Sequence, residues 1–159
     1  MEAEGRIPKV SQYGSVDPAP PAQEALVAEL TARLCDENEP MFQRMRAVFA
    51  LRNLRTDEAC LALCQGFASS SALLRHEIAY VLGQMQNTAA LPTLIQRLED
   101  DEEHVMVRHE AAEAMGAIGD RSVIPSLEKY SQDSQPEVAE SCIVAVSYTH
   151  LTLPTIHRV

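Results

Sequence analysis

Two similar stretches of sequence decide the fold: Leu74-Arg75-His76-Glu77-Ile78-Ala79-Tyr80-Val81-Leu82-Gly83 and Val107-Arg108-His109-Glu110-Ala111-Ala112-Glu113-Ala114-Met115-Gly116. In each stretch a His-Glu pair lies at the start of an apolar pattern with the spacing of an amphipathic α-helix. His76 and His109 are equivalent residues of the two copies, so the offset in residue number between them is the length of the repeat. A segment that recurs at such a distance indicates a helical repeat protein.

Two further copies extend the repeat in both directions. Residues 44–51 align with residues 75–82, and residues 138–146 align with the copy that begins at Val107, both at nearly the same offset. Second helices follow in the same register, since residues 91–94 (LPTL) match residues 124–127 (IPSL). Each of these prolines lies near a helix start, where the missing N–H costs least. The sequence therefore predicts an all-α fold, in which HEAT-like helical hairpins form an α-solenoid.

The ends of the chain differ from the repeats. Residues 1–23 are rich in proline and glycine and have no helical or strand period, so we expect a linker or arm. The repeat domain is predicted over residues 24–146, with its first helix ending near Cys35. Residues 147–159 are rich in threonine, alternate like a strand and resemble translated sequencing-adapter ends, so we expect a non-native or disordered tail.

Composition narrows the class of protein. The 159 residues are 46% hydrophobic and 4% aromatic, which fits a single domain with an aliphatic core. The net charge of −10 argues against nucleic acid as a partner, because phosphate binding depends on clustered Lys and Arg. No apolar run approaches the roughly 20 residues of a membrane span. The four cysteines lack disulfide-framework spacing, which fits a reducing compartment, so a cytoplasmic location is predicted.

The repeated His-Glu pairs are the candidate chemistry. Neighbouring helices of a stack lie about 8–10 Å apart, so His76 and His109 can project side by side and share a metal ion. Glu77 and Glu110 lie about 100° round the helix from their histidines, and we expect them to face a second ion or a bridging position. Imidazole and carboxylate donors without thiolate suit non-haem iron or manganese. Four ligands are too few for two ions, so a complementary set is expected.

A plainer interpretation is that duplication simply copied a polar pair. Against it, the other two copies carry Met45-Arg46 and Glu140-Ser141 at these positions, so the fold does not require His-Glu. The arginine before the pair recurs in three copies and is predicted to pair with an acid of an adjacent repeat. We expect three cysteines at apolar positions to be core residues: Cys60, Cys64 and Cys142.

Several separate blocks resemble the deoxyhypusine hydroxylase family: residues 15–21 (SVDPAPP), 49–53 (FALRN), 74–77 (LRHE) with 80–84 (YVLGQ), and 107–110 (VRHE) with 113–118 (EAMGAI). The resemblance implies a HEAT-repeat dyad of two similar halves, whose four His-Glu pairs hold two Fe²⁺ ions. Such an enzyme uses O₂ to hydroxylate the deoxyhypusine side chain of a translation initiation factor to hypusine. By this resemblance, the iron ligands are His76, Glu77, His109 and Glu110.

The resemblance runs from about residue 14 to residue 146 and covers only the C-terminal half of the family's dyad. It therefore implies that this chain supplies about half of the iron ligands, needs the N-terminal half as a partner, and is inactive alone. Two other hypotheses remain open. The chain is either a non-catalytic HEAT scaffold that binds a protein partner, or a repeat protein similar to the chromophore lyases. The scaffold hypothesis predicts that His76→Ala and His109→Ala leave every function intact.

Overall fold

The computed structural model describes residues 27–151, which form helices joined by short turns. The predicted arm over residues 1–23 lies outside this range, as do residues 152–159. The α-helices of the described part are α1 (Val27–Cys35), α2 (Met41–Leu54), α3 (Asp57–Gln65), α4 (Ala72–Met85), α5 (Leu91–Glu99), α6 (Val105–Ile118), α7 (Ile124–Tyr130) and α8 (Pro136–Leu151). Short 3-10 turns precede α4, α5 and α7, at Gly66–Ala68, Thr88–Ala90 and Arg121–Val123.

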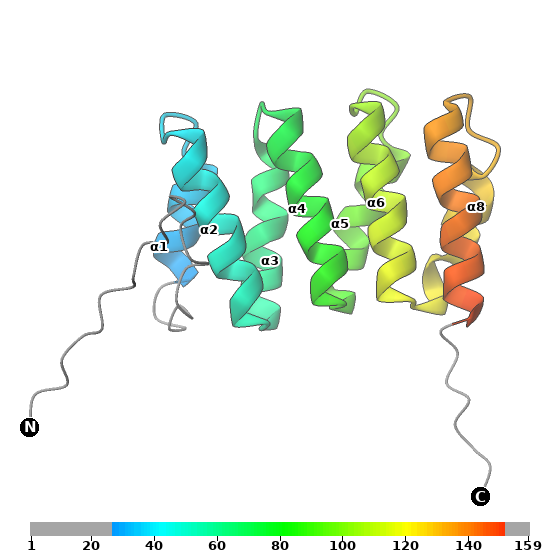
Figure 1. Cartoon of the computed structure of the whole chain (residues 1–159), viewed down its shortest axis with the longest axis horizontal. Coiled ribbons are helices and arrows are strands. Elements are labelled where there is room, and N and C mark those ends of the chain that lie inside the picture. Colours follow the sequence, from blue (N-terminus) through cyan, green and yellow to red (C-terminus); the bar gives the residue numbers. More distant parts are fainter. Residues whose placement is uncertain (1–26, 152–159) are drawn as a thin grey trace, which may run out of the picture.

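The helices form two rows. In Figure 1, α2, α4, α6 and α8 stand side by side in the front row, while α1, α3 and α5 lie behind them. The front helices begin at Met41, Ala72, Val105 and Pro136, so each step along the row equals one offset of the sequence repeat. The predicted all-α solenoid of HEAT-like hairpins is therefore confirmed. No strand occurs in residues 27–151, and no helix there is long and apolar enough to cross a bilayer.

Two glycines hold the front helices close together. A Cβ atom on Gly83 of α4 would lie 3.0 Å from the Cα atom of Ala114 on α6, and one on Gly116 of α6 would lie 2.9 Å from the Cα atom of Ala145 on α8. Gly83 and Gly116 occupy equivalent places in successive repeats, so both interfaces use the same close approach. This packing fixes the distance between the helices that carry the His-Glu pairs.

The repeated arginines join the turns. Arg75 bonds the Glu103 carboxylate at 2.7 Å, and Arg108 donates through its Nε atom to the Leu98 carbonyl at 2.9 Å. Arg108 also pairs with Asp133 at 2.5 Å across the next turn. The predicted pairing with acids across repeats is thus correct for Arg75 and Arg108. Arg44 instead pairs with Glu37 of its own repeat, in the turn before α2, and reaches the next repeat through a hydrogen bond to Ser69.

Residues 147–151 correct the predicted end of the repeat region. They belong to α8, which continues to Leu151, whereas the sequence pattern indicated a strand-like tail from Ser147 onward. Thr149 is buried in α8, and its hydroxyl is satisfied by donating to the Ala145 carbonyl at 2.8 Å, so packing of this side chain outweighs the strand preference of the sequence pattern. The predicted boundary at residue 146 therefore falls inside a helix.

Candidate metal centre

The two His-Glu pairs occupy the same place in neighbouring helices. His76 and Glu77 are the fifth and sixth residues of α4, and His109 and Glu110 are the fifth and sixth residues of α6. Because α4 and α6 pack side by side in the front row (Figure 1), the pairs lie at the same level of the stack. Ser71 starts α4 by accepting a hydrogen bond from the Leu74 N–H. Such a cap fixes the helix start, and with it the positions of the pair.

The closest contact crosses from one repeat to the next. The Nε2 atom of His76 lies 3.1 Å from an oxygen of Glu110, so each helix contributes one member of the contact. The same relation recurs one repeat later, where the Nδ1 atom of His109 lies 2.5 Å from the hydroxyl oxygen of Ser141 on α8. Ser141 stands in the fourth copy at the place that Glu110 holds in the third. A histidine therefore faces the second pair position of the following repeat.

A second acid, Glu113, completes the cluster on α6. One donor atom from each of His109, Glu110 and Glu113 lies within 4.8 Å of the other two, an arrangement that can hold a metal ion. The Nε2 atom of His109 is 3.5 Å from a Glu113 oxygen. Glu113 is absent from the predicted ligand set. The sequence could have indicated Glu113, because it lies four residues after His109 and residues four apart share one face of a helix.

Burial and charge concentrate on Glu110. Its side chain is 10% exposed, whereas that of Glu113 is 49% exposed. Burial raises the pKa of the Glu110 carboxyl, and the nearby carboxylates of Glu113 and Glu77 raise it further, while His76 and His109 act in the opposite direction. Glu77 acts on Glu110 through its charge, but it is not among the residues whose donor atoms lie within 4.8 Å of one another. A cation bound among these groups would neutralise charge that the protein itself leaves unbalanced.

The donor set fits a metal ion of the iron or manganese class. It offers imidazole nitrogens and carboxylate oxygens, and two imidazoles with one carboxylate is a known ligand set for non-haem Fe²⁺. The side chains of His76 and His109 are 31% and 24% exposed, so the cluster is open on one side to further ligands. The cluster found among the described residues contains no cysteine, and burial raises the pKa of the nearby Cys142 thiol to about 12. Cys60 and Cys142 are buried among apolar side chains, and Cys64 packs against the same core, as predicted.

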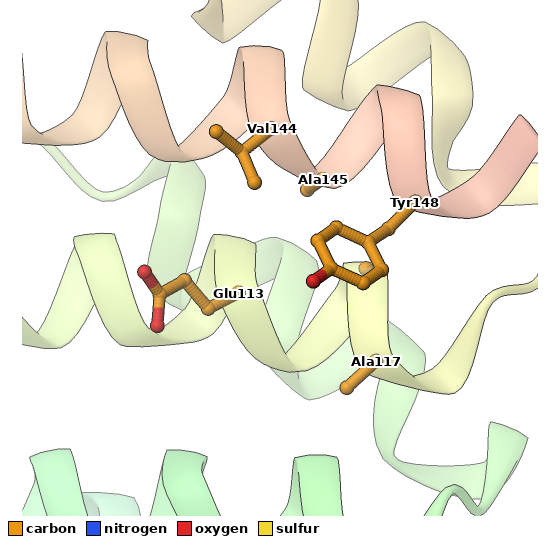
Figure 2. Close-up of a pocket in the computed structure, with 6 residues that line it drawn as sticks. Glu113, Ala117, Val144, Ala145 and Tyr148 are labelled. Atoms are coloured by element: carbon orange, nitrogen blue, oxygen red, sulfur yellow. The ribbon is translucent and has the colours of Figure 1, made fainter. Parts of the chain in front are cut away.

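Two grooves meet at Glu113. One lies between α4 and α6, where Tyr80, Gly83 and Glu110 are among its lining residues. The other lies between α6 and α8 and is shown in Figure 2, where the Tyr148 ring reaches from α8 toward α6 and the Glu113 carboxylate lies farther along α6. Glu113 lines both grooves, whereas Glu110 lines the groove between α4 and α6, so Glu113 is the cluster residue that the two grooves share.

Comparison with known proteins agrees with the fold. Residues 61–147 match the family model described as HEAT repeats, and residues 43–69 match the model described as PBS lyase HEAT-like repeat. The first match covers more than half of the chain, so the chain belongs to the HEAT-repeat family.

Within this class, the similar curated proteins are deoxyhypusine hydroxylases. The protein of that name from Gallus gallus is 56% identical over 92% of this chain and 49% of its own length. The Homo sapiens protein is 48% identical over 96% of this chain and 51% of its own length. A solved structure of human deoxyhypusine hydroxylase in complex with glycerol superposes with a TM-score of 0.80, at 48% identity, and covers 91% of this chain and 50% of that one. The predicted resemblance is confirmed, and the chain spans about half the length of these relatives.

Proposed function

We propose that this chain provides part of the iron centre of a deoxyhypusine monooxygenase. The substrate would be the deoxyhypusine side chain of a translation initiation factor, which is hydroxylated with O₂ to hypusine. The proposed ligands are His76, Glu77, His109 and Glu110, with Glu113 added because it lies within the same cluster. The enzyme would act in the cytoplasm, where translation factors are found.

The observation that carries this proposal is the contact between donors of adjacent repeats. His76 of α4 faces Glu110 of α6, and His109 belongs to the same cluster, in a chain 48–56% identical to three vertebrate deoxyhypusine hydroxylases. The fold alone does not require these residues, since the first and fourth copies carry other side chains there. Their juxtaposition therefore favours a shared ligand over a copied surface.

Each side chain has a separate part in this proposal. Bound Fe²⁺ would supply the activation of O₂. His76 and His109 would give nitrogen donors from two helices, and buried Glu110 would give a carboxylate that its surroundings hold in place. The net charge of −10 and the carboxylates of Glu77, Glu110 and Glu113 would attract a basic substrate segment.

Two ions need more donors than this surface offers. Four or five side chains from one side leave much of the coordination of two ions to other groups. We therefore expect weak iron binding and no hydroxylase activity in this chain alone. A second HEAT-repeat lobe with its own His-Glu pairs would complete the site.

The test is iron analysis after anaerobic loading, with wild type beside His109→Ala and His150→Ala. His150 is an exposed histidine of α8 that is not part of the cluster, so it controls for nonspecific imidazole binding. We expect His109→Ala to lose bound iron and His150→Ala to retain it. Equal iron in all three proteins would overturn the proposed site.

A second assay tests the activity. The chain is mixed with Fe²⁺, a deoxyhypusine-containing translation factor and the N-terminal half of a full-length relative, and hydroxylation is measured. Activity that requires both halves and is lost in His76→Ala supports the proposal. Activity of this chain alone would refute the argument that its ligand set is incomplete.

The alternative function is a HEAT scaffold for a protein partner. It is favoured by exposed apolar side chains beside the histidines on the same helices, at Leu73, Tyr80 and Met106. On this alternative, partner binding persists in His76→Ala and His109→Ala, and the iron content of wild type equals that of His109→Ala.

A further inference from the structure

Ser141 on α8 lies at the centre of a short hydrogen-bond chain. Its side chain is buried, and the residue is 5% exposed. The hydroxyl oxygen lies 2.8 Å from the backbone carbonyl of Glu137, one turn earlier in the same helix. It also lies 2.5 Å from the Nδ1 atom of His109 on α6. The serine therefore links a proposed metal ligand to the backbone of the next helix.

The direction of both hydrogen bonds follows from the number of protons. A carbonyl oxygen only accepts, so the single hydroxyl proton of Ser141 is donated to Glu137. The hydroxyl oxygen is then the acceptor for His109, and the proton between these two residues belongs to the imidazole Nδ1 atom. In a neutral imidazole the other nitrogen, Nε2, carries no proton and has a free lone pair.

This lone pair is directed at the cluster. The Nε2 atom of His109 is 3.5 Å from a Glu113 carboxylate oxygen, and in this tautomer no proton lies between them. Two electron-rich atoms that face each other in this way favour a cation between them.

His104 shows the opposite case in the same chain. Its Nδ1 atom accepts a hydrogen bond from the Met106 N–H at the start of α6, so its proton lies on Nε2. The tautomers of His104 and His109 are therefore set by the group that each Nδ1 atom faces.

We propose that Ser141 is a positioning residue, which holds His109 in the Nδ1–H tautomer and presents its Nε2 atom to a metal ion. The metal part of this inference rests on the proposed function, whereas the tautomer does not. Partners that hold a ligand histidine in this way change metal affinity by about 10–100-fold when they are removed. The sequence shows only that Ser141 stands where the third copy has Glu110. The contact with His109 explains what this serine does.

The variants are chosen to separate this role from helix stability. Ser141→Ala removes both hydrogen bonds. Ser141→Thr retains a hydroxyl that can bond the carbonyl four residues earlier. Ser147→Ala is the matched control, because Ser147 also donates to a carbonyl one turn earlier, that of Ile143, at 3.3 Å, but is exposed. Circular dichroism verifies that all variants of the full chain are folded.

The first readout is the ¹⁵N NMR spectrum of the imidazoles without metal, with His104 as the internal reference for the opposite tautomer. We expect His109 to be Nδ1–H in wild type, Ser141→Thr and Ser147→Ala, and to lose this preference in Ser141→Ala. An unchanged His109 tautomer in Ser141→Ala would overturn the proposal.

The second readout is a titration with Co²⁺, followed by its visible absorption. We expect the affinity of Ser141→Ala to fall by about 10–100-fold, and that of Ser147→Ala to equal wild type. Equal affinities of Ser141→Ala and wild type would overturn the metal part. If the tautomer follows Ser141 while wild type binds no Co²⁺, the positioning of His109 stands and the proposed metal centre fails.

Discussion

Replacement of Glu110 by glutamine tests the metal centre through two opposite effects on stability. An oxygen of this buried carboxylate lies within 4.8 Å of one of Glu113. At that distance two like charges repel by about 1 kcal/mol in a water-like dielectric, which is the appropriate value because Glu113 is half exposed. Glu110→Gln keeps the shape of the side chain and an oxygen that can accept from the His76 Nε2 atom, and it removes this repulsion. For a chain of 159 residues, we expect the metal-free variant to melt about 2–4 °C higher than wild type.

Added metal should reverse the order. At a free Fe²⁺ concentration of 100 times Kd, binding stabilises wild type by about 2.7 kcal/mol, which raises its melting temperature by about 5–11 °C. If loss of the Glu110 carboxylate weakens binding about 100-fold, the same Fe²⁺ concentration stabilises the variant by only about 0.4 kcal/mol. The variant is then more stable than wild type without metal and less stable with it.

The assay is anaerobic thermal unfolding at pH 8, followed by circular dichroism. Glu102→Gln is the matched control, because it removes the same charge from an exposed position in the turn before α6. The control should retain the full rise with Fe²⁺. A metal-free Glu110→Gln protein that melts below wild type, together with an unchanged rise on addition of Fe²⁺, would refute the reasoning.

Three further predictions concern the frame of the site, and urea unfolding measures each. Gly116→Ala places a Cβ atom 2.9 Å from the Ala145 Cα atom and should cost about 1–3 kcal/mol; unchanged stability would contradict the close approach of α6 and α8. Arg108→Met removes the cation that pairs with the Asp133 carboxylate, which keeps its hydrogen bond from the Gln135 N–H, and should cost about 1–3 kcal/mol; the added change Asp133→Asn should restore part of this loss. Burial opposes ionisation of Glu103, but hydrogen bonds from Arg75 and the backbone outweigh it and lower its pKa. The unfolded chain then binds this proton first, so stability should fall as the pH drops below about 4.3, and less steeply in Glu103→Gln.

The repeat was predictable from the sequence because its period is explicit. The offsets between the sequence copies equal the distances between the starts of α2, α4, α6 and α8. The pairing of Arg75 and Arg108 was predictable for the same reason, since a long cation at one repeat position meets an acid in the following turn. Arg44 departs from this rule, because its partner Glu37 lies in the preceding turn. The end of α8 was not predictable, because helix propensity and alternation ignore the Thr149 hydroxyl bond to the Ala145 carbonyl.

The site was only partly visible in the sequence. The His-Glu pairs are explicit, but the sequence does not state which pair members meet. The structure brings His76 to Glu110 and His109 to Ser141. Each histidine therefore meets the residue that follows its own equivalent in the next repeat. This shift depends on how far neighbouring helices slide past each other, which the alignment of the repeat copies does not contain. Ser141 was therefore noted only as a departure from the repeat.

The packing of the helices limits how the site can respond to a metal ion. Gly83 and Gly116 already hold α6 in close contact with both neighbours, so the helices themselves cannot move closer together around an ion. His76, His109 and Glu113 are all partly exposed, so the remaining coordination positions face outward. Groups from outside this stack must fill them, whether water, substrate or another protein surface. The affinity of this surface for Fe²⁺ should therefore rise when a second donor-bearing surface binds over it, because the ion then links two surfaces that each hold it weakly.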